Sequence, residues 1–222
     1  MSLAIARKSA VLAAALALGV PAIAHAAIDS VPADTELGTP SCPETDKVTN
    51  PCNVITRTTG YQAKVGTKRG LMAVKRSGRL VSWTIKLGSP SAKEIAFFKK
   101  TYGGDAQASV VVLRLGNKLR ARVVAESPAV KLEKYFGKTA EFPLETSIPV
   151  KKGYVIGLAV PTWAPALALN LGSDTSWRAS RKQGACEDYV AATQGPLNSV
   201  PQFYCLYRKV QLTYSARVIP TP

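Results

Sequence analysis

Three side chains in the last third of the chain, Trp177, Arg178 and Arg181, are well suited to holding a ligand. An indole can stack on a sugar ring, and a guanidinium group binds a carboxylate or phosphate through two parallel hydrogen bonds. If a disulfide folds the following segment back, their neighbours are Tyr204, Tyr207 and Arg208. These six residues form the candidate ligand-binding site. The structural alternative is that Trp177 closes the end of a β-fold and that Arg178 packs on its ring.

A second tryptophan, Trp163, lies between Pro161 and Pro165. Because proline cannot donate a hydrogen bond to a β-ladder, the chain is expected to form an edge, a bulge or a loop there. The segment ALALNL after it is predicted to be a strand whose leucines face the core: Leu167, Leu169 and Leu171. We therefore expect Trp163 to be a core residue.

Several kinds of catalysis lack the side chains they need. The only histidine is His25, which lies in a segment expected to be cleaved, so serine–histidine or cysteine–histidine catalysis and histidine-bound zinc are excluded from the mature chain. Hydrolysis or lysis of glycans needs only two carboxylates about 5–9 Å apart and stays open as an alternative. Most acids fall in predicted turns, as Glu141 and Glu145 do, so no catalytic residue is assigned.

No cofactor is predicted, because the chain holds no nucleotide-binding fingerprint and no nucleophile elbow. Calcium needs several oxygen ligands. The loops around Asp105 and Asp174 each supply a single acid, so a structural calcium ion is an alternative with little support.

The first 26 residues have the pattern of a secretory signal peptide. Arg7 and Lys8 precede the apolar run AVLAAALALGV, and Ala24-His25-Ala26 is a typical cleavage site. No other segment approaches the roughly 20 apolar residues that a membrane span needs. We expect a protein secreted to the extracellular space or the cell envelope, without a transmembrane segment after cleavage. A retained N-terminal anchor is the alternative.

Four cysteines, Cys42, Cys52, Cys186 and Cys205, follow the signal peptide. An even number in an exported chain indicates two disulfides. Of the three possible pairings we favour the local ones, Cys42–Cys52 and Cys186–Cys205. A zinc cluster would normally show C-x-x-C spacing, which the chain lacks.

The chain is strongly basic. Residues 52–222 hold 26 lysines and arginines against nine acids, and these cations are spread over predicted turns and along one strand, at Arg120 and Arg122. A solvated surface that keeps an exported protein soluble explains this pattern. The alternative is attraction to an anionic polysaccharide or another cell-envelope polymer. Nucleic acid would be bound only non-specifically, because no reader motif is present.

Residues 27–51 are predicted to be an extended leader rich in proline and acids, and residues 52–222 one β-domain. About nine segments alternate apolar and polar residues with period two, as half-buried strands do. In GRLVSWTIKLG the expected core residues are Val81, Trp83, Ile85 and Leu87. One helix is predicted at about 90–102, with a Ser89 cap, Pro90 at its first position and Gly103 after it. The predicted fold is an all-β, antiparallel two-sheet sandwich of jelly-roll type, with a closed barrel as the alternative.

Four strings carry a resemblance: SGRLVSWTIKLG, VVLRLG, SIPVKKGYVIGLAVPTW and LTYSARV. Together they are similar to exported bacterial β-sandwich proteins of unassigned function, over most of residues 79–218. The resemblance implies an extracellular sandwich. Carbohydrate-binding modules share this fold class, which favours a binding role by analogy. We therefore expect a non-catalytic binding protein, with a purely structural surface protein as a further alternative.

Overall fold

The computed structural model describes residues 28–33, 35–42 and 52–221. The expected signal peptide at 1–26 and much of the expected leader lie outside these residues.

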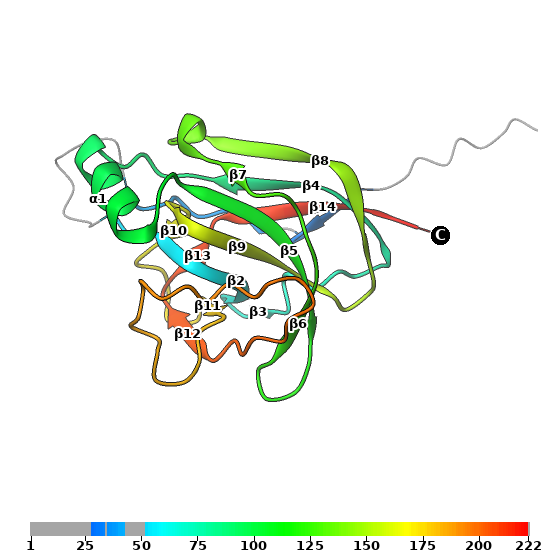
Figure 1. Cartoon of the computed structure of the whole chain (residues 1–222). Coiled ribbons are helices and arrows are strands. Elements are labelled where there is room, and N and C mark those ends of the chain that lie inside the picture. Colours follow the sequence, from blue (N-terminus) through cyan, green and yellow to red (C-terminus); the bar gives the residue numbers. More distant parts are fainter. Residues whose placement is uncertain (1–27, 34, 43–51, 222) are drawn as a thin grey trace, which may run out of the picture.

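Two antiparallel sheets face each other (Figure 1). The smaller sheet has the order β1 (Asp29–Val31), β14 (Tyr214–Pro220), β4 (Gly78–Lys86), β8 (Thr139–Val150). The larger sheet has the order β12 (Cys205–Arg208), β11 (Ser176–Ala179), β2 (Ile55–Val65), β9 (Val155–Ala164), β5 (Gln107–Leu115), β6 (Ala121–Glu126). Three short pairings complete the fold: β3 (Lys68–Arg69) with β2, β7 (Val130–Lys131) with β5, and β10 (Leu167–Ala168) with β13 (Gln211–Leu212). A 3₁₀ turn, η1 (Glu133–Tyr135), precedes β8.

This strand order confirms the predicted jelly-roll-type sandwich. The strands β1-β14-β4-β8 face β2-β9-β5-β6, and the chain passes between the two sheets as it does in an eight-stranded double Greek key. Strands β10 to β13 are an insertion between β9 and β14. Within this insertion, β11 and β12 extend the larger sheet beyond β2.

The core follows the predicted alternation, with one local shift. Three of the four expected residues of β4 and its end are buried: Trp83, Ile85 and Leu87. The fourth, Val81, is only half-buried, and its neighbour Leu80 is fully buried instead. The reason is a β-bulge, because pairing with β14 passes from Leu80 directly to Ser82 and leaves Val81 as an extra residue.

The proline-rich segment around Trp163 forms the expected irregularity. On β2 the pairing advances from Thr56 to Thr58, while on β9 it moves from Trp163 to Val160, so β9 holds one extra residue there. Trp163 is fully buried, and its Nε1 donates to the Gly104 carbonyl oxygen at 2.9 Å. The strand predicted in ALALNL is shorter than expected, because only β10 is paired and the backbone turns at Asn170 (φ 57°). Two of its three leucines are consequently only half-buried: Leu169 and Leu171.

The predicted helix forms as α1 (Ala92–Tyr102), but its cap differs from the expectation. Ser91 is the cap, not Ser89, because a capping box joins it to Glu94: the Glu94 carboxylate accepts from the Ser91 backbone N–H at 2.7 Å. Gly103 ends the helix in the left-handed conformation, with φ 89°.

Both predicted disulfides are present, Cys42–Cys52 and Cys186–Cys205. Part of the segment assigned to the leader belongs to the sandwich, since Asp29–Val31 pairs with β14 as strand β1.

The carboxylate of Glu141, expected in a turn, lies within β8 and accepts from the Ser82 hydroxyl at 2.7 Å. This strand tolerates its prolines because it lies at the edge of its sheet.

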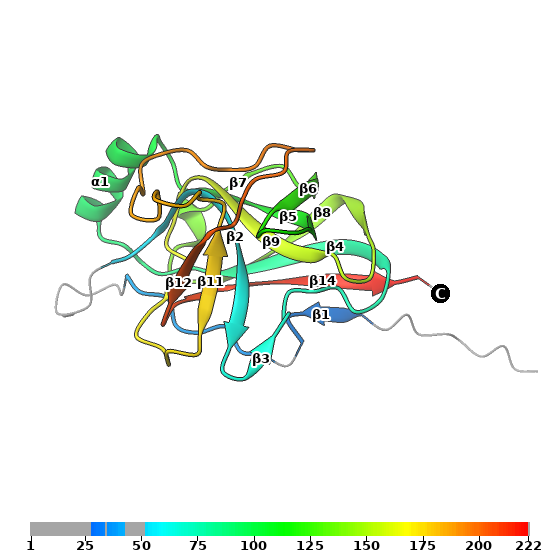
Figure 2. The same cartoon turned by 90° about the horizontal axis from the view of Figure 1, so that it is seen from below.

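Several connections meet at the end of the sandwich that carries α1 (Figures 1 and 2). The Gly88 N–H, before the helix, donates to the Pro165 carbonyl at 2.8 Å, and the Gly137 N–H, before β8, donates to the Gly88 carbonyl at 3.1 Å. The Ser41 N–H, in the β1–β2 connection, donates to the Leu167 carbonyl at 2.7 Å. Segments distant in sequence therefore build one surface at this end.

Candidate functional site

A cavity of about 420 Å³ opens at this end, between α1, the start of β2 and the β10–β13 insertion. We call it the aromatic pocket, because six of its lining side chains are aromatic: Phe97, Phe98, Tyr102, Trp177, Tyr189 and Tyr207. Arg181 is its only charged lining residue among those the structure describes. Thr56 and Leu169 contribute to the wall.

Strand pairing places the two central aromatic rings together. Trp177 on β11 lies directly opposite Tyr207 on β12, and side chains of directly paired residues project from the same face. Their rings stack at 4.7 Å between centroids, with an interplanar angle of 27°. Trp177 is only 4% exposed, so this stack forms a buried wall of the pocket.

The indole N–H of Trp177 has no hydrogen-bond partner among the described residues. The opposite edge of the ring covers Gly60 on β2 so closely that a Cβ there would lie 2.7 Å from Cζ3 and 2.8 Å from Cε3. Because Nε1 lies on the other side of the indole from these atoms, the N–H points away from Gly60. A buried donor without a partner costs about 1–3 kcal/mol, so this group needs an explanation.

Arg181 is a buried cation held by neutral oxygens. It is 1% exposed; its Nε donates to the Asp188 carbonyl at 2.9 Å and its Nη2 to the Thr56 carbonyl at 2.9 Å. Its guanidinium carbon lies 5.6 Å from the centre of the Tyr189 ring. None of the ion pairs formed within the described part of the chain involves Arg181. A buried charge of this kind favours an anion that can reach it.

The rim is formed by exposed rings and the loop closed by the second disulfide. Phe97 is 57% exposed and Tyr189 is 42% exposed. The Thr56 hydroxyl donates to the Tyr189 carbonyl at 2.7 Å, and the Tyr207 hydroxyl donates to the Cys186 carbonyl at 2.6 Å, which fixes this loop against the sheet. Partial desolvation of its phenol group, reinforced by the hydrogen bond to Glu187, raises the pKa of Tyr189 to about 12, although the residue as a whole is exposed. Burial also raises the pKa of Tyr207, so both phenols stay protonated at neutral pH.

The structure separates the six predicted site residues into two groups. Trp177, Arg181 and Tyr207 come together in the aromatic pocket. The other three do not line it: Arg178, Tyr204 and Arg208. Arg178 follows Trp177 in the strand and points to the opposite face, where its Nη1 donates to the Phe203 and Tyr204 carbonyls at 3.2 and 3.0 Å. Arg208 is exposed.

Sequence reasoning missed the parts of the pocket that come from distant segments. Phe97 and Phe98 are adjacent in α1, and neither was among the predicted site residues. Two adjacent aromatic residues in a predicted helix were the available signal, because they cannot both face the core and one of them is left near the surface. For Thr56, which holds Arg181 from 125 positions away, no sequence signal exists.

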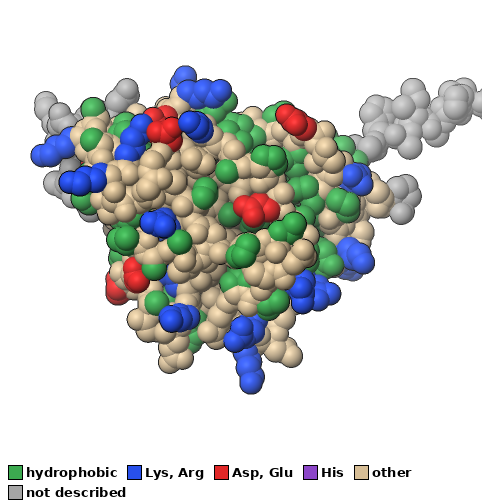
Figure 3. Space-filling model, viewed as in Figure 1, with side chains coloured by type: hydrophobic (Ala, Val, Ile, Leu, Met, Phe, Trp, Pro, Cys, Tyr) green, Lys and Arg blue, Asp and Glu red, His purple; other side chains and the backbone are tan. Residues whose placement is uncertain are grey.

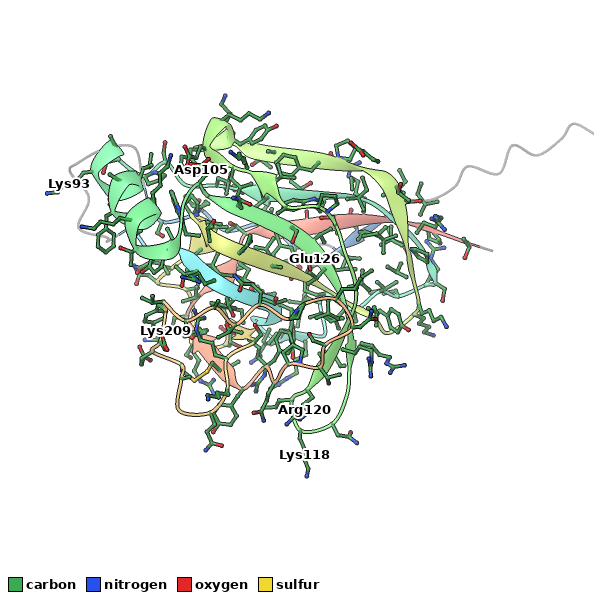
Figure 4. All side chains as sticks on the ribbon, in the orientation of Figure 1. Lys93, Asp105, Lys118, Arg120, Glu126 and Lys209 are labelled. Carbon is green, nitrogen blue, oxygen red and sulfur yellow. A yellow bond between two sulfur atoms is a disulfide. The ribbon has the colours of Figure 1, made fainter. Side chains whose placement is uncertain are left out.

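Two carboxylates, those of Asp105 and Glu133, line a shallow hollow elsewhere, beside η1. Asp105 is labelled in Figure 4. Asp105 and Glu133 both pair with the Lys99 ammonium, at 3.0 and 2.9 Å. The hydrogen bonds from Lys99 and Lys131 hold the pKa of the Asp105 carboxyl below its usual value. Asp105 is therefore ionised at neutral pH and has no proton to give to a leaving group.

Neither a membrane-spanning helix nor a cluster of metal-ligating side chains occurs in the part of the chain described. No helix there is both long and apolar enough to cross a bilayer, and no group of three or more potential metal ligands comes together. No protein-family model matches the sequence, and no curated protein or solved structure is significantly similar to it.

Proposed function

We propose that this protein is an exported, non-catalytic binding protein whose aromatic pocket holds an acidic sugar unit of an anionic glycan or cell-envelope polymer. The observation that carries the proposal is the combination of Arg181, a buried cation with only neutral partners, and the unpartnered N–H of Trp177 in one pocket. Both groups are closed off from solvent in this structure, so a carboxylate that enters the pocket reaches them after a local shift of the pocket wall. It then supplies what both groups lack, a negative charge and a hydrogen-bond acceptor.

The shape and the walls of the pocket favour a sugar. Its volume of about 420 Å³ falls in the range of small-molecule sites, which is roughly 300–1,000 Å³. The exposed rings of Phe97 and Tyr189 at the rim offer flat apolar faces against which a sugar ring can stack. The two disulfides are compatible with an exported protein.

Binding fits the pocket better than hydrolysis or lysis. The lining contains no aspartate or glutamate among the described residues, whereas glycan hydrolysis needs a carboxylate pair at the substrate. The hollow with Asp105 and Glu133 does hold two carboxylates, but Lys99 pairs with both. Incubation of the protein with the glycan it binds, followed by chain-length analysis, tests the enzymatic alternative: shortened chains would support it, and Asp105→Asn should then abolish the cleavage.

Isothermal titration with an oligouronate and the matching neutral oligosaccharide tests the binding proposal. We expect the acidic ligand to bind at least about tenfold more tightly, the discrimination of one charged hydrogen-bonded contact. Trp177→Phe keeps the stacked ring and removes the N–H, so it should weaken the acidic ligand by about tenfold and leave the neutral one unchanged. Arg208→Gln removes a nearby exposed charge that does not line the pocket and is the matched control.

Two outcomes would overturn the proposal. One is equal affinity for the acidic and the neutral ligand. The other is a loss on Arg208→Gln as large as that on Trp177→Phe, which would mean that general positive charge, and not the pocket, attracts the glycan. Near-ultraviolet circular dichroism of each variant checks that the fold is retained.

A further inference from the structure

The hairpin between β5 and β6 carries exposed cations, which lie at the lower edge of the molecule in Figure 3 and include Lys118 and Arg120, labelled in Figure 4, together with two exposed leucines. Every residue from 114 to 120 is exposed, and the segment includes Arg114, Lys118 and Arg120. No aspartate or glutamate occurs between residues 107 and 125. Among the cations lie two large apolar side chains in water, Leu115 at 47% and Leu119 at 39% exposure. We call residues 114–120 the hairpin tip.

The turn at the hairpin tip holds a leucine where the backbone does not favour one. The Arg120 N–H donates to the Asn117 carbonyl at 3.1 Å, and the two residues between them are both left-handed, Lys118 with φ 55° and Leu119 with φ 59°. Such two-residue turns strongly favour Asn-Gly, because a Cβ is strained in this conformation. The Leu119 side chain is neither buried in the core nor suited to its backbone, so the fold alone does not explain it.

The charges at the hairpin tip are also unsatisfied by the fold. Arg114 lies directly opposite Arg122 across the two strands, and like charges in this position repel. The guanidinium groups of Arg120 and Arg122 donate to neutral carbonyls, those of Val200 and Asn198. No ion pair within the described residues involves these arginines, so an external anionic partner would relieve their repulsion.

We infer that the hairpin tip inserts shallowly into the surface of a lipid bilayer that carries anionic headgroups. A soluble polyanion would neutralise the cations but leave both leucines in water. A bilayer surface satisfies both, because headgroups meet Lys118 and Arg120 while the acyl boundary takes up Leu115 and Leu119. Val200, whose carbonyl accepts from Arg120, is 39% exposed and adds to the apolar surface beside the tip.

This docking leaves the aromatic pocket free. Strand β5 begins near α1, and its nine residues extend about 27 Å to the hairpin tip. Figure 1 shows the β5–β6 hairpin projecting from the body well away from α1. A protein bound to a membrane through the tip can therefore still receive a ligand at its other end, and the two sites can be tested independently.

Co-sedimentation with vesicles tests the inference. The probes are phosphatidylcholine vesicles that contain about one-third phosphatidylglycerol and vesicles of phosphatidylcholine alone. We expect binding to the anionic vesicles and little to the neutral ones. The pair Lys118→Gln/Arg120→Gln should lower the partition coefficient by more than about tenfold, at roughly fivefold per charge. The matched control Lys151→Gln/Lys152→Gln removes two exposed charges from a turn outside the tip and should change it less than about threefold.

Leu119→Asn separates a membrane role from a structural one, because its two readouts move in opposite directions. Asparagine tolerates the left-handed conformation, so the variant should unfold at a higher temperature than the wild type. It also removes an apolar anchor, so vesicle binding should fall about fivefold to tenfold. The inference is overturned if Leu119→Asn binds vesicles as tightly as the wild type. It is also overturned if Leu119 serves self-association. In that case sedimentation velocity would show a dimer for the wild type and a monomer for Leu119→Asn.

Discussion

A matched pair of tryptophan variants tests whether the N–H of Trp177 is truly without a partner in the free protein. Trp163 and Trp177 are both buried in the same domain, and each becomes phenylalanine in one variant. The two substitutions remove the same atoms. The difference of interest is in the hydrogen bonding of the indole, because Trp163 Nε1 donates to the Gly104 carbonyl at 2.9 Å, while Trp177 Nε1 has no partner among the described residues.

The expected difference follows from the hydrogen bonds. The loss of buried ring volume is the same kind of change at both sites and largely cancels in the comparison. Trp163→Phe also loses a hydrogen bond, which lowers the free energy of unfolding by about 1 kcal/mol. Trp177→Phe removes an unsatisfied donor, which raises the free energy of unfolding by about 1–3 kcal/mol. We therefore expect Trp177→Phe to be the more stable variant by about 2–4 kcal/mol.

Urea unfolding with the disulfides intact, followed by far-ultraviolet circular dichroism, measures this difference. Equal slopes against urea are required, since a changed slope would indicate a changed unfolded or native ensemble. If Trp177→Phe loses as much stability as Trp163→Phe, the Trp177 N–H has a partner in the free protein. The Trp177 N–H would then need no ligand to satisfy it.

Three further predictions concern the pocket and its surroundings. Gly60→Ala places a Cβ 2.7 Å from the Trp177 ring, so it should lower the free energy of unfolding in urea by about 1–3 kcal/mol and weaken oligouronate binding in calorimetry. Unchanged stability and affinity would contradict the close approach of the ring to Gly60. The Asp105 carboxyl should titrate below 3.8 by NMR, and Lys99→Met should raise the pKa of Asp105. The ionised Asp105 stabilises the fold above pH 3.8, and this contribution is lost as the pH falls through the lowered pKa, so a rise in stability on acidification would contradict the pairing. Tyr189 should titrate near pH 12 in ultraviolet absorbance, and Tyr189→Phe should remove that step. A step near 10 would contradict the partial desolvation of the phenol and its hydrogen bond to Glu187.

The scaffold was largely predictable because its signals are local. Period-two alternation is visible in any strand with one buried face, and it located the core residues of β4 apart from the shift at Val81. Prolines on both sides of Trp163 predicted the irregularity in β9 from backbone chemistry alone. The local disulfides were predicted from the expected export of the chain and from the short spacings between the cysteines. In each case, neighbouring residues carry the physical cause.

The site was only half predictable because it depends on relationships between distant segments. Residue type alone made Trp177 and Arg181 candidates for the site. The position of Tyr207 beside Trp177 depends on the register of β11 against β12, which pairs these two residues directly. Arg178 points away from this face because it is adjacent to Trp177 in β11, and successive side chains of a strand project to opposite sides. The oxygens that hold Arg181 come from Thr56 and Asp188, one of them on a different part of the fold.

The polar groups of the aromatic pocket support the proposed ligand site over a purely structural end cap. Phenylalanine at position 177 would keep the stack on Tyr207 without burying an unsatisfied N–H, and an apolar side chain at 181 would avoid burying a charge among neutral groups. An end cap gains nothing from either polar group. A pocket that receives a carboxylate gains from both, because the same anion accepts the N–H and neutralises the guanidinium. Addition of an oligouronate should therefore reverse the order of the two phenylalanine variants or reduce the gap between them, since only Trp177→Phe loses a contact to the ligand; a gap unaffected by saturating ligand would assign Trp177 to the core alone.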